Sequence, residues 1–202
     1  MIMDQKLSER RIVIAGGSGF LGLNLARYLA DKDCEVVLLS RHQPTQEGPW
    51  EHVVWDARTV GPWAKYLEGA TAVVNLAGRS VDCIKTAANC DEILRSRVEA
   101  TNVLGLAVCE VQARPKVWIQ MSTAHIYGDP SELVCDENSA LGCGLAPTVG
   151  CAWEAAFRSL ALPAMRRVIL RTSFVMGQEG GALPRLAALA RWGLGGKAGH
   201  GR

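Results

Sequence analysis

Short apolar runs rich in valine and isoleucine alternate along this chain with longer segments that have helical periodicity. The first run, Arg11–Ala15, contains a continuous Ile-Val-Ile, which predicts a strand buried on both faces. Strands and helices in strict succession are typical of βαβ units and a parallel sheet. The alternation therefore predicts an α/β fold with a doubly wound parallel sheet and helices on both of its faces.

The predicted elements are defined by where these patterns start and stop. Strands are expected at residues 11–15, 35–40, 52–56, 72–77, 116–122 and 167–172. Helices are expected at residues 20–31, 91–113, 152–162 and 183–192. Residues 129–149 are expected to be a loop, because prolines and glycines interrupt them repeatedly. The sequence shows no internal repeats.

One domain over residues 11–192 accommodates all of these elements. Residues 1–10 precede it as a polar N-terminal tail, and residues 193–202 follow it as a glycine-rich tail without a closing element. We therefore expect the glycine-rich tail to be the start of an incomplete C-terminal part. A chain of 202 residues with 49% apolar residues can bury a full core without disulfides or metals.

Composition excludes several classes of function. Lysine and arginine outnumber aspartate and glutamate by only two, so no basic field favours nucleic acid. No apolar run approaches the roughly 18 to 20 residues that span a bilayer. The seven cysteines form no Cys-x-x-Cys pair, and no histidine cluster accompanies Cys135, Cys143 and Cys151. These features predict a cytoplasmic protein with reduced thiols, no metal site and no membrane contact.

A glycine-rich turn joins the first predicted strand to the first predicted helix, with the sequence Ala-Gly-Gly-Ser-Gly-Phe-Leu-Gly over residues 15–22. Gly16 allows a tight turn, Gly19 lets the backbone approach a pyrophosphate, and Gly22 lets the helix pack close to the strand. The amides at the helix start then bind phosphate. The alternative is a plain tight turn, but the strand–turn–helix context favours dinucleotide binding in a Rossmann-type domain. The candidate residues are Gly16, Ser18, Gly19, Phe20, Leu21 and Gly22.

The end of the second strand indicates which dinucleotide is bound. An NAD site usually has Asp or Glu here to bind the ribose 2′-hydroxyl. This sequence has Ser40-Arg41 instead, and its next acidic residue is Glu47. The planar guanidinium of Arg41 suits a 2′-phosphate, and Ser40 offers a further donor. We therefore expect NADP rather than NAD, the alternative being a solvated arginine at a strand end.

Five motifs occur in a fixed order: the glycine turn, Ser40-Arg41, Asn-Leu-Ala-Gly ending at Gly78, Ser-Thr-Ala-His-Ile-Tyr-Gly ending at Gly128, and Arg-Thr-Ser-Phe-Val-Met-Gly ending at Gly177. Together they resemble the extended and atypical short-chain dehydrogenase/reductase superfamily, which includes nucleotide-sugar epimerases and dehydratases. Ser96-Arg97 and Trp153-Glu154 make the chain most similar to the epimerase family 39U1-like (YfcH-like) subgroup.

The resemblance has several implications for ligands and length. Leu76, Ala77 and Gly78 would line the adenosine side of the cofactor cleft, and Glu92 and Arg97 would lie near bound NADP. The substrate would be a small molecule, such as a carbonyl compound or a nucleotide sugar. A protein of this kind runs to about 300 residues by the resemblance, with a C-terminal part that helps bind substrate. Homodimers through a pair of helices are common in the superfamily, although the sequence itself selects no oligomeric state.

The resemblance also assigns catalytic positions, and two of them carry unsuitable residues. Thr123 matches the Ser/Thr that polarises the substrate oxygen. The Tyr-x-x-x-Lys pair, which transfers the proton in the superfamily, is replaced by Thr148 and Ala152. A threonine hydroxyl is far less acidic than a phenol, and alanine has no charge. Tyr127 and His125 are the remaining candidates for proton transfer.

Two hypotheses therefore stay open. In the first, the protein is an NADP-dependent oxidoreductase or an epimerase-like enzyme, and Thr123 orients the substrate oxygen. In the second, it is a non-catalytic NADP-binding regulator or partner-binding module that keeps the phosphate turn and lacks the proton donor. The residues at positions 148 and 152 separate the two.

Overall fold

The computed structural model describes residues 10–129 and 134–196. The chain divides into two compact units, one up to Arg171 and one from Thr172. The first unit holds the candidate cofactor residues and ends earlier than the boundary at residue 192 expected from the sequence. Residues 1–9 of the expected N-terminal tail and 197–202 of the expected glycine-rich tail lie outside the described residues.

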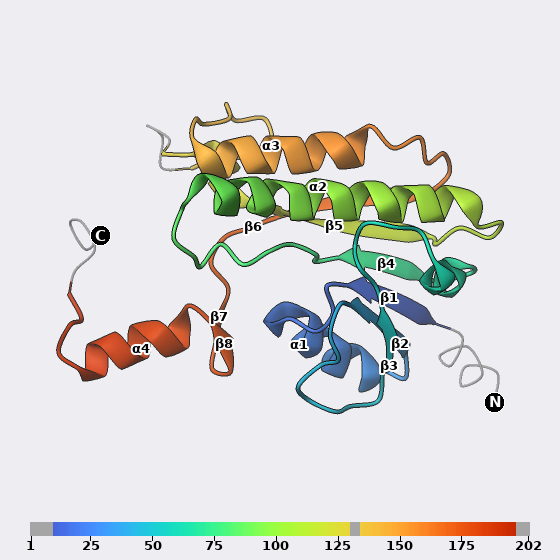
Figure 1. Ribbon diagram of the computed structural model, residues 1–202, viewed down its shortest axis with the longest axis horizontal. Helices are drawn as coiled ribbons and strands as arrows, with labels where there is room; N and C mark the ends of the chain where they lie inside the picture. The colour runs from blue at the N-terminus through green and yellow to red at the C-terminus, as the bar shows by residue number, and fades with distance from the viewer. Residues whose placement is uncertain (1–9, 130–133, 197–202) are drawn as a thin grey trace. The chain divides into compact units, whose positions relative to one another are not determined.

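A six-stranded sheet with the order β3-β2-β1-β4-β5-β6 forms the first unit (Figure 1). Its strands are β1 (Arg11–Ala15), β2 (Glu35–Ser40), β3 (Glu51–Val54), β4 (Ala72–Asn75), β5 (Val117–Thr123) and β6 (Arg166–Thr172). β1 pairs in parallel with β2 and β4, β2 with β3, and β4 with β5. The order reverses between β1 and β4, which in such folds opens a ligand crevice at the carboxyl ends of the strands. The predicted doubly wound Rossmann-type fold is confirmed.

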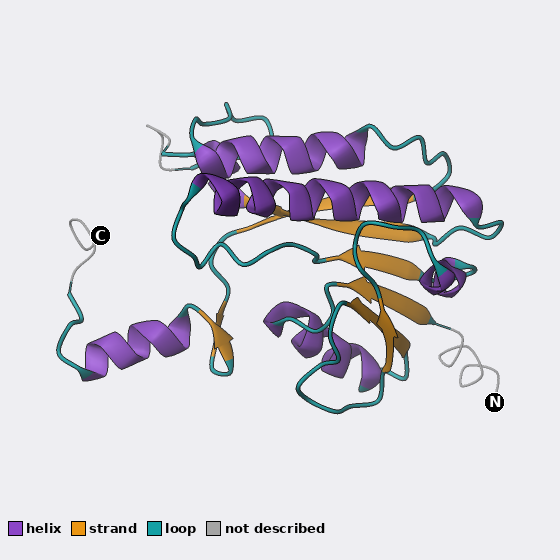
Figure 2. Cartoon of the chain, in the orientation of Figure 1, coloured by secondary structure: helices purple, strands orange, loops and turns teal. Residues whose placement is uncertain are grey.

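Helices cover both faces of this sheet (Figure 2). One face packs against α1 (Phe20–Ala30), and the other packs against α2 (Ala87–Glu110) and α3 (Leu145–Arg158). Successive strand residues point to opposite faces, so each central strand supplies both cores. The register partners Ile14, Leu38 and Val74 belong to the α1 core, and their neighbours Val13, Val37 and Val73 belong to the other. Burial on both faces explains the continuous apolar runs of the sequence.

Two helices differ from the sequence prediction. α2 begins at Ala87 rather than near residue 91, because Thr86 caps it by accepting a hydrogen bond from the Asn89 amide. α3 begins at Leu145, so the predicted loop over 129–149 is wrong for its last residues. Pro147 does not prevent this helix, since it lies in the first turn, where no amide needs an intrahelical acceptor. Residues 148 and 152 are consequently both helical.

Smaller elements connect the strands. β3 and β4 end at Val54 and Asn75, two residues earlier than predicted in each case. Two 3₁₀ helices, η2 (Pro62–Leu67) and η3 (Ala124–Tyr127), were not predicted. Strand ends and short helices depend on tertiary hydrogen bonds that periodicity does not contain.

The second unit contains a short antiparallel pair and one helix. β7 (Met176–Gly177) pairs with β8 (Gly180–Gly181), and α4 (Leu183–Arg191) follows. The helix confirms the prediction for residues 183–192. In the part of the chain that the structure describes, no helix is long and apolar enough to cross a membrane.

Candidate functional site

A pocket of about 560 Å³ lies at the carboxyl ends of β1 to β4, where the strand order reverses. Most of the cofactor residues predicted from the sequence line it: Gly16, Ser18, Gly19, Ser40, Arg41, Leu76, Ala77, Gly78 and Glu92. The other four, Phe20, Leu21, Gly22 and Arg97, do not line it. The structure therefore brings the ends of four separate strands into one site, as the parallel topology requires.

The pocket-lining residues that follow β3 were not predicted from the sequence. Trp55, Asp56, Ala57 and Arg58 line the pocket, together with Leu39, His42, Val54, Arg79, Ser96 and Glu99. The sequence could have indicated them, because the carboxyl ends of parallel strands lie at the same edge of a sheet. Residues directly after the third strand should therefore lie beside Ser40 and Arg41.

Gly16 and Gly22 permit two close backbone approaches in the glycine turn. Gly16 has a φ of +76°, and a Cβ atom on it would lie 2.8 Å from the Ala77 amide nitrogen. A Cβ atom on Gly22 would lie 2.5 Å from the carbonyl oxygen of Gly17, which sequence reasoning did not single out. The turn is thus fitted against the loop after β4 on one side and against α1 on the other.

Gly19 faces the pocket at the start of α1. It is the N-cap of the helix, and no side chain caps the first turn. A Cβ atom on Gly19 would meet only the Gly16 carbonyl, at an ordinary 3.5 Å. The first-turn amides and the positive end of the helix dipole are therefore directed at a position suited to an anion.

Ser40 and Arg41 have different roles from each other. The Ser40 hydroxyl donates to the His42 carbonyl at 2.8 Å and lies 3.0 Å from Nε2 of His52. Its proton is therefore engaged within the protein, which contradicts the expectation that it donates to a phosphate. Ser40 instead fixes the backbone turn from which Arg41 projects. Arg41 is exposed and lines the pocket.

A buried polar network supports the loop of Leu76, Ala77 and Gly78. The Asn75 side chain accepts from the Ala77 amide at 3.1 Å and donates to Gln120 and Thr101 at 3.0 and 3.2 Å. Trp153 of α3 donates to the same Thr101 hydroxyl at 3.1 Å. Because a buried amide must satisfy its hydrogen bonds, this network fixes the position of the loop against Gly16.

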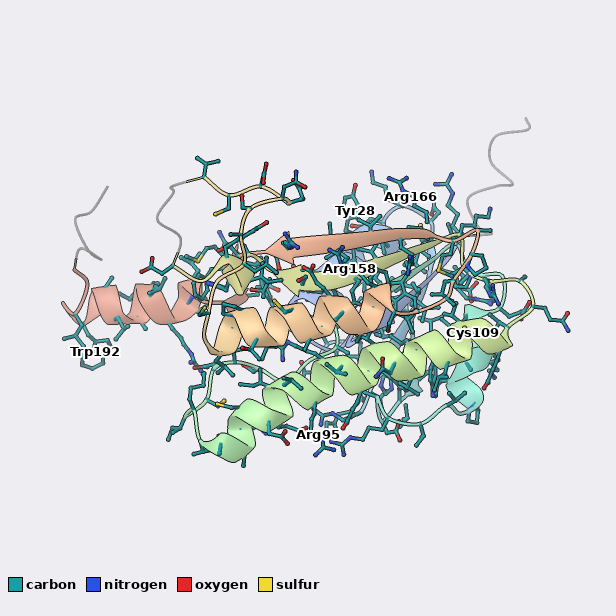
Figure 3. All side chains as sticks on the ribbon, turned by 90° about the horizontal axis from the view of Figure 1, so that it is seen from above. Tyr28, Arg95, Cys109, Arg158, Arg166 and Trp192 are labelled. Carbon is teal, nitrogen blue, oxygen red and sulfur yellow. The ribbon has the colours of Figure 1, made fainter. Side chains whose placement is uncertain are left out.

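Glu92 and Glu99 of α2 are held by Arg58, so neither acidic group is unpaired in the pocket wall. Arg58 Nε lies 2.9 Å from Glu99 Oε2, and its Nη2 lies 3.5 Å from Glu92 Oε1. Arg95, which projects from α2 (Figure 3), contacts the other Glu99 oxygen at 2.7 Å. Glu92, which was predicted to lie near bound NADP, lines the pocket and is paired there with Arg58.

Thr123 ends β5 close to the first turns of α3. Its hydroxyl accepts from the His125 amide at 3.1 Å and keeps its own proton for another acceptor. A Cβ atom on Gly150 would lie 3.2 Å from the Thr123 methyl group, so the turn that carries positions 148 and 152 packs against this threonine. The two positions that the resemblance assigns to the Tyr-x-x-x-Lys pair both lie on α3 and carry Thr148 and Ala152.

Tyr127 and His125, the two substitute candidates, lie in η3 after Thr123. The Tyr127 phenol donates to the Asp136 carbonyl at 2.7 Å and accepts from Arg171 Nη1 at 2.8 Å. Its proton is therefore bound to a backbone carbonyl, and Tyr127 ties the loop at Asp136 to β6. His125 is exposed on η3.

The carboxylate of Glu154 is the centre of a buried charged cluster behind Thr123. Arg171 binds it through two nitrogens at 2.8 and 2.9 Å, Ser122 donates at 2.7 Å, and Arg158 of the same helix donates at 3.0 Å. Burial alone would raise the pKa of Glu154. The hydrogen bonds from Arg171, Ser122 and Arg158 outweigh that effect and lower the pKa to about 2.

This low pKa predicts a dependence of stability on pH. The unfolded chain takes up the proton near pH 4.5 and the folded protein only near pH 2, so the stabilisation is complete above about pH 5 and decreases as the pH falls to 2. The full effect is about 3 kcal/mol for one group. Urea unfolding at pH 7, 4 and 3 should show wild type losing more stability than Glu154→Gln. Parallel losses in the two proteins would contradict the assignment.

Comparisons with known proteins agree with this geometry. The chain matches the NAD dependent epimerase/dehydratase family over residues 12–178. It is 32% identical over 195 residues to the epimerase family protein SDR39U1 of Bos taurus, which covers 95% of this chain and 63% of the relative. It is 31% identical over 201 residues to the epimerase family protein ML0860 of Mycobacterium leprae, which covers 99% of this chain and 64% of the relative.

A solved structure shows the same likeness. The crystal structure of human epimerase family protein SDR39U1 (isoform 2) with NADPH matches with a TM-score of 0.78 and 32% identity, covering 95% of this chain and 63% of that one. This chain thus spans less than two thirds of the length of these relatives. The resemblance inferred from the motifs is confirmed, and the chain belongs to the NAD-dependent epimerase/dehydratase family of the extended short-chain dehydrogenase/reductase type.

Proposed function

We propose that this protein is an NADP-dependent oxidoreductase or epimerase-like enzyme that acts on a small carbonyl compound or a nucleotide sugar. The observation that carries the proposal is the pocket, which joins the uncapped start of α1 to Arg41 at the end of β2. The helix start suits a diphosphate, and Arg41 suits a 2′-phosphate. The human relative whose structure contains NADPH supports this choice of cofactor.

The residues around the site would have separate roles in binding the cofactor and the substrate. The glycine turn binds the diphosphate through main-chain amides, and the loop at Ala77 and Gly78 closes the adenosine side. The bound nicotinamide would supply hydride transfer. Thr123 would donate its hydroxyl proton as a hydrogen bond to the substrate oxygen, which orients that oxygen and polarises its bond.

The cofactor assignment predicts a selective effect of Arg41→Ala. Removing one charge-assisted contact to the 2′-phosphate should weaken NADPH binding about 10- to 100-fold and leave NADH binding nearly unchanged. Calorimetric titration with both nucleotides measures this, and Arg27→Ala in the last turn of α1, outside the pocket lining, is the control. Equal affinities of wild type for NADPH and NADH would refute the assignment of Arg41.

A second function, non-catalytic NADP binding in a regulator or partner-binding module, is favoured by one observation. The helical positions that carry Tyr and Lys in active relatives by the resemblance hold Thr148 and Ala152, while the hydroxyl of Tyr127 is bound to Asp136. NADPH consumption should be screened against carbonyl compounds and nucleotide sugars. Turnover supports the enzyme; tight NADPH binding without turnover of any substrate supports the binding protein.

A further inference from the structure

Arg97 of α2 carries a largely desolvated charge, in contrast to the ion-paired arginines of the first unit. Arg58, Arg95, Arg158 and Arg171 each pair with a carboxylate. Arg97 pairs with none in the ranges that the structure describes, although its guanidinium is largely withdrawn from water. A desolvated charge without a counter-charge is unfavourable, so the fold has a reason to keep one only where something else supplies the opposite charge.

The guanidinium is held in a fixed position. Its Nη1 donates to the carbonyl of Arg79 at 3.0 Å and to that of Ile93 at 2.8 Å. Its Cζ lies 5.1 Å from the ring centroid of Trp153, so the charge is stacked on α3. Within residues 10–129 and 134–196, Nε and Nη2 donate to no protein acceptor. Three N–H groups on two nitrogens, and a full positive charge, therefore remain for a ligand.

Arg97 lies directly beside the pocket wall. A Cβ atom on Gly78 would be 3.0 Å from its Cζ, and Gly78, Arg79 and Ser96 all line the pocket. Trp153, on which the guanidinium stacks, belongs to the helix that also carries positions 148 and 152. The charge thus lies between the loop at Gly78 and Arg79, which lines the pocket, and Trp153 of α3.

We propose that Arg97 binds a phosphate group of a ligand, which supplies the counter-charge missing from the protein. This inference rests on the proposed cofactor site and identifies one of its charges. Two sources share the required chemistry: the diphosphate of the cofactor, and a phosphate of a second ligand such as a nucleotide sugar. The planar fork of arginine suits either, because it can donate two parallel hydrogen bonds to phosphate oxygens.

The test compares wild type with Arg97→Gln and with Arg114→Gln, which removes an equally positive but exposed side chain far along the sequence from the pocket. NADPH affinity is measured by calorimetry at one ionic strength. Thermal unfolding is measured with inorganic phosphate and with pyrophosphate, each with and without saturating NADPH. Circular dichroism verifies that the variants are folded.

If the cofactor supplies the phosphate that Arg97 binds, Arg97→Gln should bind NADPH at least about tenfold more weakly than wild type, and Arg114→Gln should bind it like wild type. If a second ligand supplies the phosphate that Arg97 binds, the affinity of Arg97→Gln for NADPH should equal that of wild type. Phosphate or pyrophosphate should then stabilise the NADPH-saturated wild type and Arg114→Gln, but not Arg97→Gln. A folded Arg97→Gln that matches wild type in both measurements overturns the proposal.

A second variant, Arg97→Lys, and the phosphate measurements cover the cases in which Arg97→Gln does not fold or wild type does not bind NADPH. If Arg97→Gln does not fold, Arg97→Lys keeps the charge without the fork and should still lose several-fold in affinity. Wild-type affinity of that variant for NADPH and for both phosphate probes overturns the proposal equally. If wild type binds no NADPH, the proposed function fails, whereas the phosphate measurements still decide the role of Arg97.

Discussion

Replacing Glu154 with alanine is expected to lower the free energy of unfolding by about 3–5 kcal/mol, because it leaves buried charges without a partner. The Glu154 side chain is only 5% exposed and binds Arg171 through two nitrogens. Its removal leaves the Arg171 guanidinium, itself 14% exposed, without its carboxylate. Urea unfolding at pH 7 measures the loss.

A matched variant separates this effect from the general loss of a carboxylate. Glu35 also pairs with an arginine, Arg11, at 2.8 Å, but both side chains are much more exposed, at 43% and 33%. Glu35→Ala should therefore change stability by no more than about 1 kcal/mol. Equal losses in Glu35→Ala and Glu154→Ala would show that the buried cluster stabilises no more than a surface ion pair.

The second large effect is expected at Gly22, where alanine should abolish cofactor binding and destabilise the protein. In an ordinary helix interior, Gly→Ala stabilises by about 1 kcal/mol, so the expected sign is the opposite of the one that helix propensity predicts. Here the new Cβ atom would lie 2.5 Å from the Gly17 carbonyl oxygen and 2.6 Å from its Cα, and both contacts are with backbone atoms rather than with the end of a flexible side chain. We expect a loss of about 1–3 kcal/mol from overpacking.

The control for Gly22→Ala is Gly19→Ala, in the same turn. Its Cβ atom would meet only an ordinary contact at 3.5 Å, and its φ of −81° suits alanine. Gly19→Ala should unfold like wild type and bind NADPH more weakly, because the methyl group occupies the approach to the amides. Thermal unfolding and NADPH titration of both variants test this. Stabilisation by Gly22→Ala with unchanged binding would contradict the packing of the turn.

The fold was predictable because hydrophobic burial on both faces of the sheet imposes continuous apolar runs such as Ile12 to Ile14. The glycine turn was predictable for a similar reason, since each close backbone approach excludes every side chain. Local patterns of this kind depend on a few neighbouring residues. The start of α3 at Leu145 was missed because Gly142 and Gly144 before it, and Pro147 in its first turn, outweighed the helical pattern that follows.

Charged contacts between distant segments could not be predicted in the same way. Arg58 meets Glu99 from 41 positions away, and Arg171 meets Glu154 across α3 and β6. The sequence shows where the arginines and glutamates lie along the chain, but not which of them form ion pairs in the folded protein. The same limit explains why Ser40 was assigned to phosphate binding, although its partner His52 lies on the adjacent strand.

A crystal structure of this protein with NADP would show directly whether the glycine turn and Arg41 bind the cofactor. It should show the diphosphate within hydrogen-bond distance of main-chain amides at the start of α1, and the 2′-phosphate at the guanidinium of Arg41. A nucleotide bound elsewhere, or a glycine turn that stays without nucleotide at saturating concentration, would show that this turn is not the cofactor site.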